Sequence, residues 1–178
     1  MTAGDTILAH NIDVPDYPTP GVVFKDLTPL LADATAFAEV VAALADAGRD
    51  EGGQPVVDRV VGMEARGFIY AAPVALALGA GFVPVRKAGK LPRASYAESY
   101  ALEYGQATLE MHRDALPQGA RVLLVDDVLA TGGTAVATRQ LIEACGGVAV
   151  GASVLMELSF LPGRKTVGDV PLTSLLTV

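Results

Sequence analysis

Apolar residues along the chain follow two alternating patterns, short continuous runs and helical spacings. Phe37, Val40, Val41 and Leu44 stand at positions i, i+3, i+4 and i+7, which predicts a helix over 33–47. The same reasoning predicts helices over 66–78 and 134–145, and valine-rich apolar runs predict strands over 56–63, 82–85, 121–125, 148–156 and 172–178. Since strands and helices alternate, we expect an α/β fold, a mostly parallel sheet with helices on both faces.

Two segments depart from this alternation. Residues 1–30 contain Pro15, Pro18 and Pro20 and are predicted to form an extended arm, or hood. Residues 87–109 combine glycine, proline and serine with three tyrosines and show no clear period. A stretch of this length without regular structure is usually a binding loop or a lid, and the tyrosines favour a lid. We expect residues 1–178 to form a single domain that carries both segments.

Composition narrows the possible functions. Of the 178 residues, 51% are hydrophobic and the formal net charge is −7, which disfavours binding to duplex nucleic acid. Prolines and glycines interrupt the uncharged run 67–85, so we expect no membrane span. The lone cysteine, Cys145, fits a reducing compartment and hence a cytoplasmic location, and its apolar helix face predicts a packing role. His10 and His112 have no metal-ligand partner at helical or strand spacing and receive no role.

The strongest chemical signal is the run VLLVDDVLATGGT over 122–134. An apolar strand is followed by the carboxylates Asp126 and Asp127, a glycine loop and the start of a helix. The carboxylates repel phosphate but suit ribose hydroxyls or a hydrated Mg²⁺. The spacing matches neither a Walker A loop nor GxGxxG. Glycine backbone N–H groups, a helix N-terminus and threonine hydroxyls together predict a phosphate cradle at Ala130, Thr131, Gly132, Gly133 and Thr134.

This run resembles the motif with which type I phosphoribosyltransferases bind 5-phosphoribosyl 1-pyrophosphate (PRPP). Further segments are similar to the adenine phosphoribosyltransferases, in order from about Tyr17 to the C-terminus: GVVFKDLTPL at 21–30, GMEARGF at 62–68, RKAGKLP at 86–92, LEYG at 102–105 and MEL at 156–158. The resemblance implies a purine-salvage enzyme that transfers the 5-phosphoribosyl group from PRPP to adenine with Mg²⁺, giving AMP and pyrophosphate. It also implies a homodimer.

The resemblance assigns residues to the parts of PRPP. It implies that the loop from Ala130 to Thr134 binds the 5′-phosphate, and that Asp126 and Asp127 serve the ribose hydroxyls and position the metal-bound sugar. The Mg²⁺ is then held mainly by the substrate. Cations are needed where pyrophosphate leaves, because negative charge develops there as the bond to C1′ breaks. The resemblance gives this task to Arg66, Lys87 and Lys90.

The base and the lid are assigned in the same way. The resemblance implies that Phe24 and Leu158 lie on the two faces of adenine, and that backbone groups near Val23 and Lys25 contact its edge. Many members carry arginine where Lys25 stands, and lysine cannot form the planar fork of arginine. Glu103 and Tyr104 reach over the substrates in the family, with the glutamate as the candidate for proton transfer at the purine.

Two other functions stay open on the sequence. A phosphoribosyltransferase for hypoxanthine or xanthine shares the PRPP loop, although segment 21–30 disfavours it. A PRPP-sensing regulator of transcription needs a nucleic-acid-binding element, yet the sequence shows no helix-turn-helix pattern and the charge of −7 is unsuitable. We therefore expect small-molecule substrates, with neither nucleic acid nor a membrane as a partner.

Overall fold

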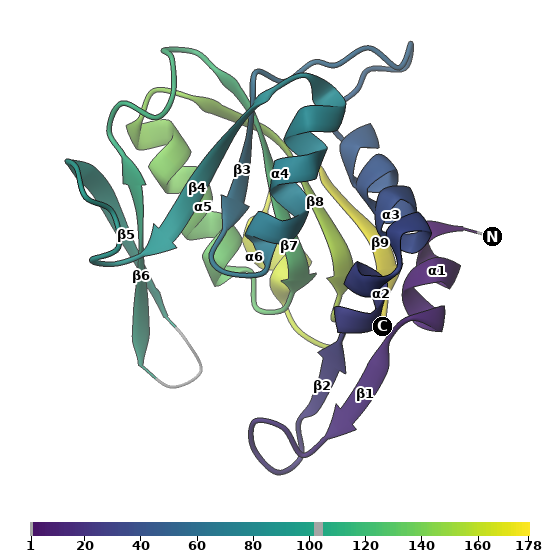
Figure 1. Ribbon diagram of the computed structural model, residues 1–178. Coiled ribbons are helices and arrows are strands. Elements are labelled where there is room, and N and C mark those ends of the chain that lie inside the picture. The colour runs from purple at the N-terminus through teal and green to yellow at the C-terminus, as the bar shows by residue number, and fades with distance from the viewer. Residues whose placement is uncertain (1, 102–104) are drawn as a thin grey trace.

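Five parallel strands form the centre of the molecule (Figure 1). The structure is a computed structural model and describes residues 2–101 and 105–178. The strands lie in the order β4-β3-β7-β8-β9, and their apolar sequences suit a sheet that is covered on both faces. Their bounds are β3 Arg59–Met63, β4 Gly81–Lys87, β7 Arg121–Leu129, β8 Val148–Glu157 and β9 Leu172–Thr177. The predicted mostly parallel α/β fold is confirmed.

Helices cover both faces of this sheet, as predicted (Figure 1). On one face α3 (Ala34–Asp46) and α4 (Gly67–Leu78) pack with α1 (Ala3–Ala9) and α2 (Thr28–Ala32) over one apolar core. On the other face α5 (Gly133–Ala144) packs over a second core, which includes Cys145. Asp33 caps α3 by accepting hydrogen bonds from the backbone of Thr35 and Ala36, both at 2.9 Å. Among the described residues, none of the helices has the length and apolarity needed to cross a bilayer.

The segment 87–109 contains regular structure, so the expectation of a stretch without it is wrong, while its assignment as a lid stays a prediction. It contains strand β5 (Ser95–Ala101) and the start of β6 (Gln106–His112), which pair antiparallel and extend the sheet beside β4. Tyr96 and Tyr100 alternate with more exposed residues along β5 and pack against the α5 core. The alternation escaped detection because the exposed positions hold alanine and serine, which give no strong polar signal.

The N-terminal segment is also more ordered than an extended arm. Thr2 and Asp5 form a capping box at the start of α1, and the helix buries Ile7 against α3. Strand β1 (Ile12–Pro15) then pairs antiparallel with β2 (Val23–Asp26). This hairpin projects below the body of the protein at the same end as the carboxyl ends of the parallel strands (Figure 1). It corresponds to the expected hood.

Candidate functional site

The two adjacent carboxylates lie inside a strand and not after it. Strand β7 continues to Leu129, and Asp126 pairs in register with Val154 of β8. Successive side chains of a strand point to opposite faces, so Asp126 and Asp127 are separated although they are neighbours in sequence. Asp126 lines a cavity of about 80 Å³ beneath the glycine loop. Asp127 lines a different cavity together with Arg66 and Phe24.

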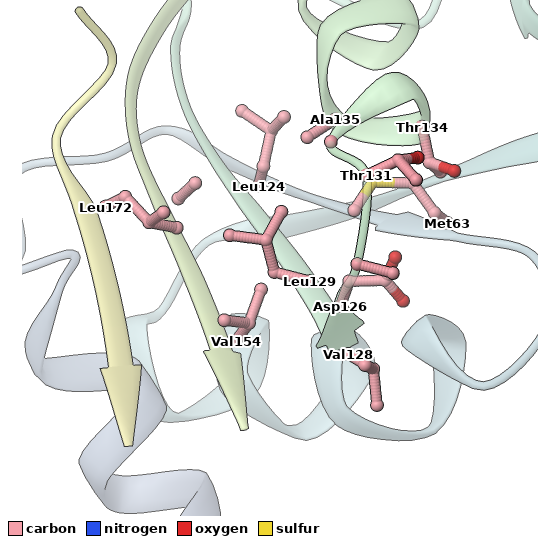
Figure 2. A pocket seen from close by; sticks show the side chains of 13 residues that line it. Met63, Leu124, Asp126, Val128, Leu129, Thr131, Thr134, Ala135, Val154 and Leu172 are labelled. Carbon is pink, nitrogen blue, oxygen red and sulfur yellow. The ribbon is translucent and has the colours of Figure 1, made fainter. Parts of the chain in front are cut away.

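The glycine loop joins β7 to the N-terminus of α5 above the first cavity. Figure 2 shows the side chains of Thr131 and Thr134 beside the start of α5, with Leu129 and Val154 farther down in the cavity. Gly132 is the N-cap residue of α5 and has φ +85°, a left-handed conformation that favours glycine. No side chain of the described residues caps α5. Its first backbone N–H groups are therefore available as donors to an anion.

A contact with the β5–β6 hairpin fixes one side of this loop. The Thr134 hydroxyl donates a hydrogen bond to the Tyr100 hydroxyl at 3.2 Å. A Cβ atom on Gly133 would lie 2.7 Å from the Tyr100 ring, so the ring packs directly on the loop backbone. The hairpin thus contacts the predicted phosphate cradle through Tyr100, a residue that the sequence analysis assigned to a segment without regular structure.

Arg66 links Asp127 to the N-terminal hairpin. Its Nε lies 2.7 Å from Asp127 Oδ2, and its guanidinium lies 5.1 Å from the centre of the Phe24 ring. The contact with Asp127 is an ion pair and not an aligned hydrogen bond. Asp127 Oδ2 is buried and accepts no hydrogen bond from the described residues. Its negative charge is paired with the Arg66 guanidinium.

The residues expected to contact adenine surround one cavity. It has a volume of about 150 Å³. Lys25 Nζ is bonded to both carboxylate oxygens of Asp13 at 2.8 Å, so its charge is held within the β1–β2 hairpin. The backbone contact of Lys25 with a base stays a prediction. Apolar side chains supply most of the lining, which is made by Val22, Val23, Phe24, Lys25, Arg66, Val128 and Leu158.

Glu64 contacts two of the residues expected to bind pyrophosphate, Lys90 through its side chain and Lys87 through its backbone. Glu64 forms ion pairs with Lys90 and with Arg86, the latter at 3.4 Å, and accepts the backbone N–H of Lys87 at 2.9 Å. These contacts, chiefly the hydrogen bond from Lys90, lower the pKa of Glu64 to about 2. A carboxylate that is charged at neutral pH therefore fixes the backbone at Lys87 and the side chain of Lys90.

The strand carboxylates have contrasting surroundings. Burial raises the pKa of Asp126 well above its ordinary value, and the charge of Asp127 raises it further. Asp126 Oδ1 accepts the backbone N–H of Asp127 at 2.9 Å. Within residues 2–101 and 105–178, no group of three or more His, Cys, Asp or Glu side chains is arranged to hold a metal ion.

Most of the predicted site residues converge at the carboxyl ends of the parallel strands, where α/β sheets bind ligands. Glu103 and Tyr104 lie outside the described residues. Sequence reasoning gave no functional role to Glu64, Tyr100 and Val128. Val128 was detectable in principle, because it stands two residues after Asp126 on a strand and therefore shares its face. The contacts of Glu64 and Tyr100 span 22 to 34 residues and leave no local signal.

Comparison with known proteins is consistent across sequence and structure. The sequence model of the phosphoribosyl transferase domain family matches residues 30–166. A relative from Nocardioides sp., an adenine phosphoribosyltransferase, is 70% identical over 96% of this chain and 92% of its own length. The adenine phosphoribosyltransferase of Thermobifida fusca is 61% identical over 93% of this chain and 92% of its own.

Solved structures give the same result. The crystal structure of adenine phosphoribosyltransferase from Thermoanaerobacter pseudethanolicus superposes with a TM-score of 0.91 at 45% identity, covering 98% of this chain and 99% of that chain. The Saccharomyces cerevisiae enzyme, complexed with adenine and an imino-altritol bisphosphate, has a TM-score of 0.92 at 36% identity, with 98% of both chains covered.

Proposed function

The chain belongs to the adenine phosphoribosyltransferase family, and we propose that its β1–β2 hairpin, glycine loop and Glu64-anchored cations bind adenine, the 5′-phosphate and pyrophosphate, respectively. The enzyme transfers the 5-phosphoribosyl group of PRPP to adenine in purine salvage and releases AMP and pyrophosphate. The observation that carries the proposal is that the hairpin and the glycine loop line cavities that share Val128 of β7, while Glu64 directly follows β3, the strand that pairs with β7.

Adenine binds in the cavity between Phe24 and Leu158. An aromatic ring on one side and an aliphatic side chain on the other suit a flat purine. Backbone groups at Val23 and Lys25 then contact the edge of the base, while the Lys25 side chain stays with Asp13. Arg66 lines the same cavity and packs on Phe24, and these contacts support the position of the ring.

The 5′-phosphate binds at the loop from Ala130 to Thr134. The free N–H groups at the start of α5 and the hydroxyls of Thr131 and Thr134 supply hydrogen bonds to its oxygens. Val128 lines both the cavity beneath this loop and the base cavity. The phosphate and the base of one nucleotide therefore bind on either side of the end of β7.

The ribose lies between them, against the carboxylate pair. Asp127 lines a cavity with Arg66 and Phe24, and its carboxylate is the acceptor that we assign to a ribose hydroxyl. Asp126 acts from the opposite face of the strand, where its raised pKa favours an uncharged carboxyl. When PRPP is bound, Mg²⁺ would be held mainly by the substrate and would supply positive charge where negative charge develops on pyrophosphate. The carboxylates position the sugar that carries the metal.

The pyrophosphate meets Arg66, Lys87 and Lys90. The C1′–oxygen bond breaks as the purine nitrogen bonds to C1′, and negative charge moves onto the pyrophosphate. Fixed cations stabilise that charge most effectively when they need no rearrangement. Glu64 holds Lys90 and the Lys87 backbone before substrate arrives. By resemblance, Glu103 accepts the proton that leaves the purine.

We also propose a homodimer formed through α4. Ile69 and Leu76 stand seven residues apart on one face of this helix, and Leu76 is 82% exposed. Phe82 at the start of β4 is also exposed and packs edge-to-face on Phe68. A second copy of the chain would cover this apolar face. Leu76→Glu should shift the protein from dimer to monomer in sedimentation velocity; a wild-type monomer would refute the proposal.

The cytoplasmic location and the single domain stay predictions.

The function is tested with purified protein, PRPP, Mg²⁺ and each purine base in turn. Nucleotide formation is followed by chromatography. We expect AMP from adenine and little product from hypoxanthine or guanine, because unpaired groups at the base edge discriminate strongly. Equal use of hypoxanthine would overturn the proposed base contacts while leaving the fold unaffected.

A further inference from the structure

An ion pair between a buried carboxylate and a half-exposed guanidinium lies behind the adenine and 5′-phosphate regions. Glu157 ends β8, and only 8% of its side chain is exposed. Arg164, in the short helix α6 (Gly163–Val167), contacts it with two nitrogens: Nε donates to Oε1 at 2.9 Å and Nη2 to Oε2 at 2.5 Å. The Ser174 hydroxyl of β9 donates to the same Oε2 at 2.9 Å. Such forked contacts fix geometry as well as charge.

The ion pair joins the two ends of segment 157–164, and Leu158 in this segment lines the base cavity. Leu158 follows Glu157 directly and lines that cavity with Phe24. Its backbone N–H donates to the Leu129 carbonyl at 3.0 Å, and the Glu157 carbonyl accepts the N–H of Val178 at 2.9 Å. The backbone that carries Leu158 is thereby fixed to β7 and to the C-terminal end of the chain.

Helix α6, at the other end of this segment, packs against the proposed phosphate loop. A Cβ atom on Gly163 would overlap the carbonyl oxygen of Ala130, and a Cβ on Gly132 would lie 2.7 Å from the Gly163 carbonyl oxygen. Helix α6 therefore touches the loop backbone directly. Val167 in α6 packs with Leu129 and Val154, which line the cavity beneath the loop. A shift of α6 would displace the phosphate cradle.

We propose that the Glu157–Arg164 pair is a positioning element that holds Leu158 and the phosphate loop in a fixed spatial relationship. This inference rests on the proposed function, which assigns those two regions to adenine and to the 5′-phosphate of the same nucleotide. The pair touches neither substrate, and Arg164 extends from α6 to the Leu172 carbonyl at 3.1 Å and to Ser174 on the side of β9. We therefore expect the pair to affect the binding of AMP and of the substrates from which AMP is made. The binding of pyrophosphate should not change, because the cations assigned to it lie at the ends of β3 and β4.

The test is the reverse reaction, in which AMP and pyrophosphate bind as separate substrates. Arg164→Lys keeps the charge but loses the fork, and Arg164→Met removes both. We expect the KM for AMP to rise about fivefold in the lysine variant and tenfold or more in the methionine variant. The KM for pyrophosphate should stay within about twofold of the wild-type value. Arg139→Met is the matched control, because it breaks another partly exposed arginine–glutamate pair, Arg139–Glu143 on α5.

Each outcome decides the proposal. If both KM values rise together, or neither changes, the pair is only structural and the proposal is wrong. Arg164→Met leaves Glu157 buried without its partner and risks unfolding. In that case Arg164→Lys and Ser174→Ala decide, since both keep the carboxylate hydrogen-bonded. Failure of the proposed function looks different, because the wild-type protein would then make no AMP from adenine and PRPP.

Discussion

Thr134, in the first turn of α5, donates its hydroxyl proton to the hydroxyl of Tyr100 at the end of the β5–β6 hairpin, at 3.2 Å. Because a hydroxyl both donates and accepts, Tyr100 can reverse the bond and leave the Thr134 proton for a phosphate oxygen. The hairpin leads into Glu103 three residues later. The contact therefore joins 5′-phosphate binding to the segment that carries the candidate proton acceptor.

Tyr100→Phe tests this link. The ring still packs on Gly133, and only the hydroxyl is lost. One hydrogen bond contributes about 1 kcal/mol, so the KM for PRPP should rise roughly fivefold while the KM for adenine stays near the wild-type value. The control is Tyr96→Phe, on the same face of β5, whose ring packs under Arg113 at 5.0 Å. Equal behaviour of the two variants would show that the Tyr100 hydroxyl has no role in PRPP binding.

The strand, glycine loop and helix of 122–134 were predictable and the hairpin contact was not, for a physical reason. A buried parallel strand followed by glycines and a helix leaves a continuous local signature in the sequence, and 122–134 carries all of it. Tyr100 reaches Thr134 across 34 residues, and Lys90 reaches Glu64 across 26. Such contacts depend on how strands are ordered in the sheet, which periodicity does not determine.

The carboxylates show a second limit of sequence analysis. Adjacent acidic residues suggested a pair acting together after the end of a strand. The strand instead continues to Leu129, because Val128 and Leu129 keep pairing with β8. Asp126 and Asp127 consequently point to opposite faces. The first charged residues after an apolar run therefore do not mark where the backbone pairing of the strand stops.

Asparagine substitutions should separate the two carboxylates. Asp127→Asn removes the charge that faces Arg66 at 2.7 Å, and we expect kcat/KM for PRPP to fall by about 10²-fold or more. Asp126→Asn should cost less, since the raised pKa of Asp126 already favours its neutral form and the amide oxygen can still accept the Asp127 N–H. Steady-state kinetics with thermal melts as a folding control give the comparison. A larger loss in Asp126→Asn would contradict this assignment.

Glu64 should make stability depend on acid pH. Its pKa of about 2 in the folded protein lies below the ordinary value of 4.5, so its contribution is present above about pH 4.5 and is lost as the pH falls toward 2. Urea unfolding of wild type and Glu64→Gln should differ by about 1–2 kcal/mol at pH 7, a figure reduced for the solvent around half-exposed Lys90. The difference should shrink between pH 5 and pH 3.

The control for this measurement is Glu51→Gln, in an exposed loop. It should leave the free energy of unfolding unchanged across the same range. A constant difference for Glu64→Gln from pH 7 to pH 3 would show that the ion pairs with Lys90 and Arg86 contribute nothing measurable.

The last prediction concerns Glu103, which by resemblance accepts the purine proton. Its role arises only when the lid covers both substrates, and a group that acts chiefly in the transition state changes kcat more than binding. General acid–base catalysis contributes about 10²–10⁴-fold. Glu103→Ala should therefore melt like wild type, still bind PRPP and lose roughly 10²-fold or more in kcat. The glutamine of Glu103→Gln can still form hydrogen bonds but cannot accept the purine proton. Nearly full activity of that variant would show that Glu103 positions the substrate and does not transfer the proton. Full activity of the alanine variant would remove Glu103 from the mechanism altogether.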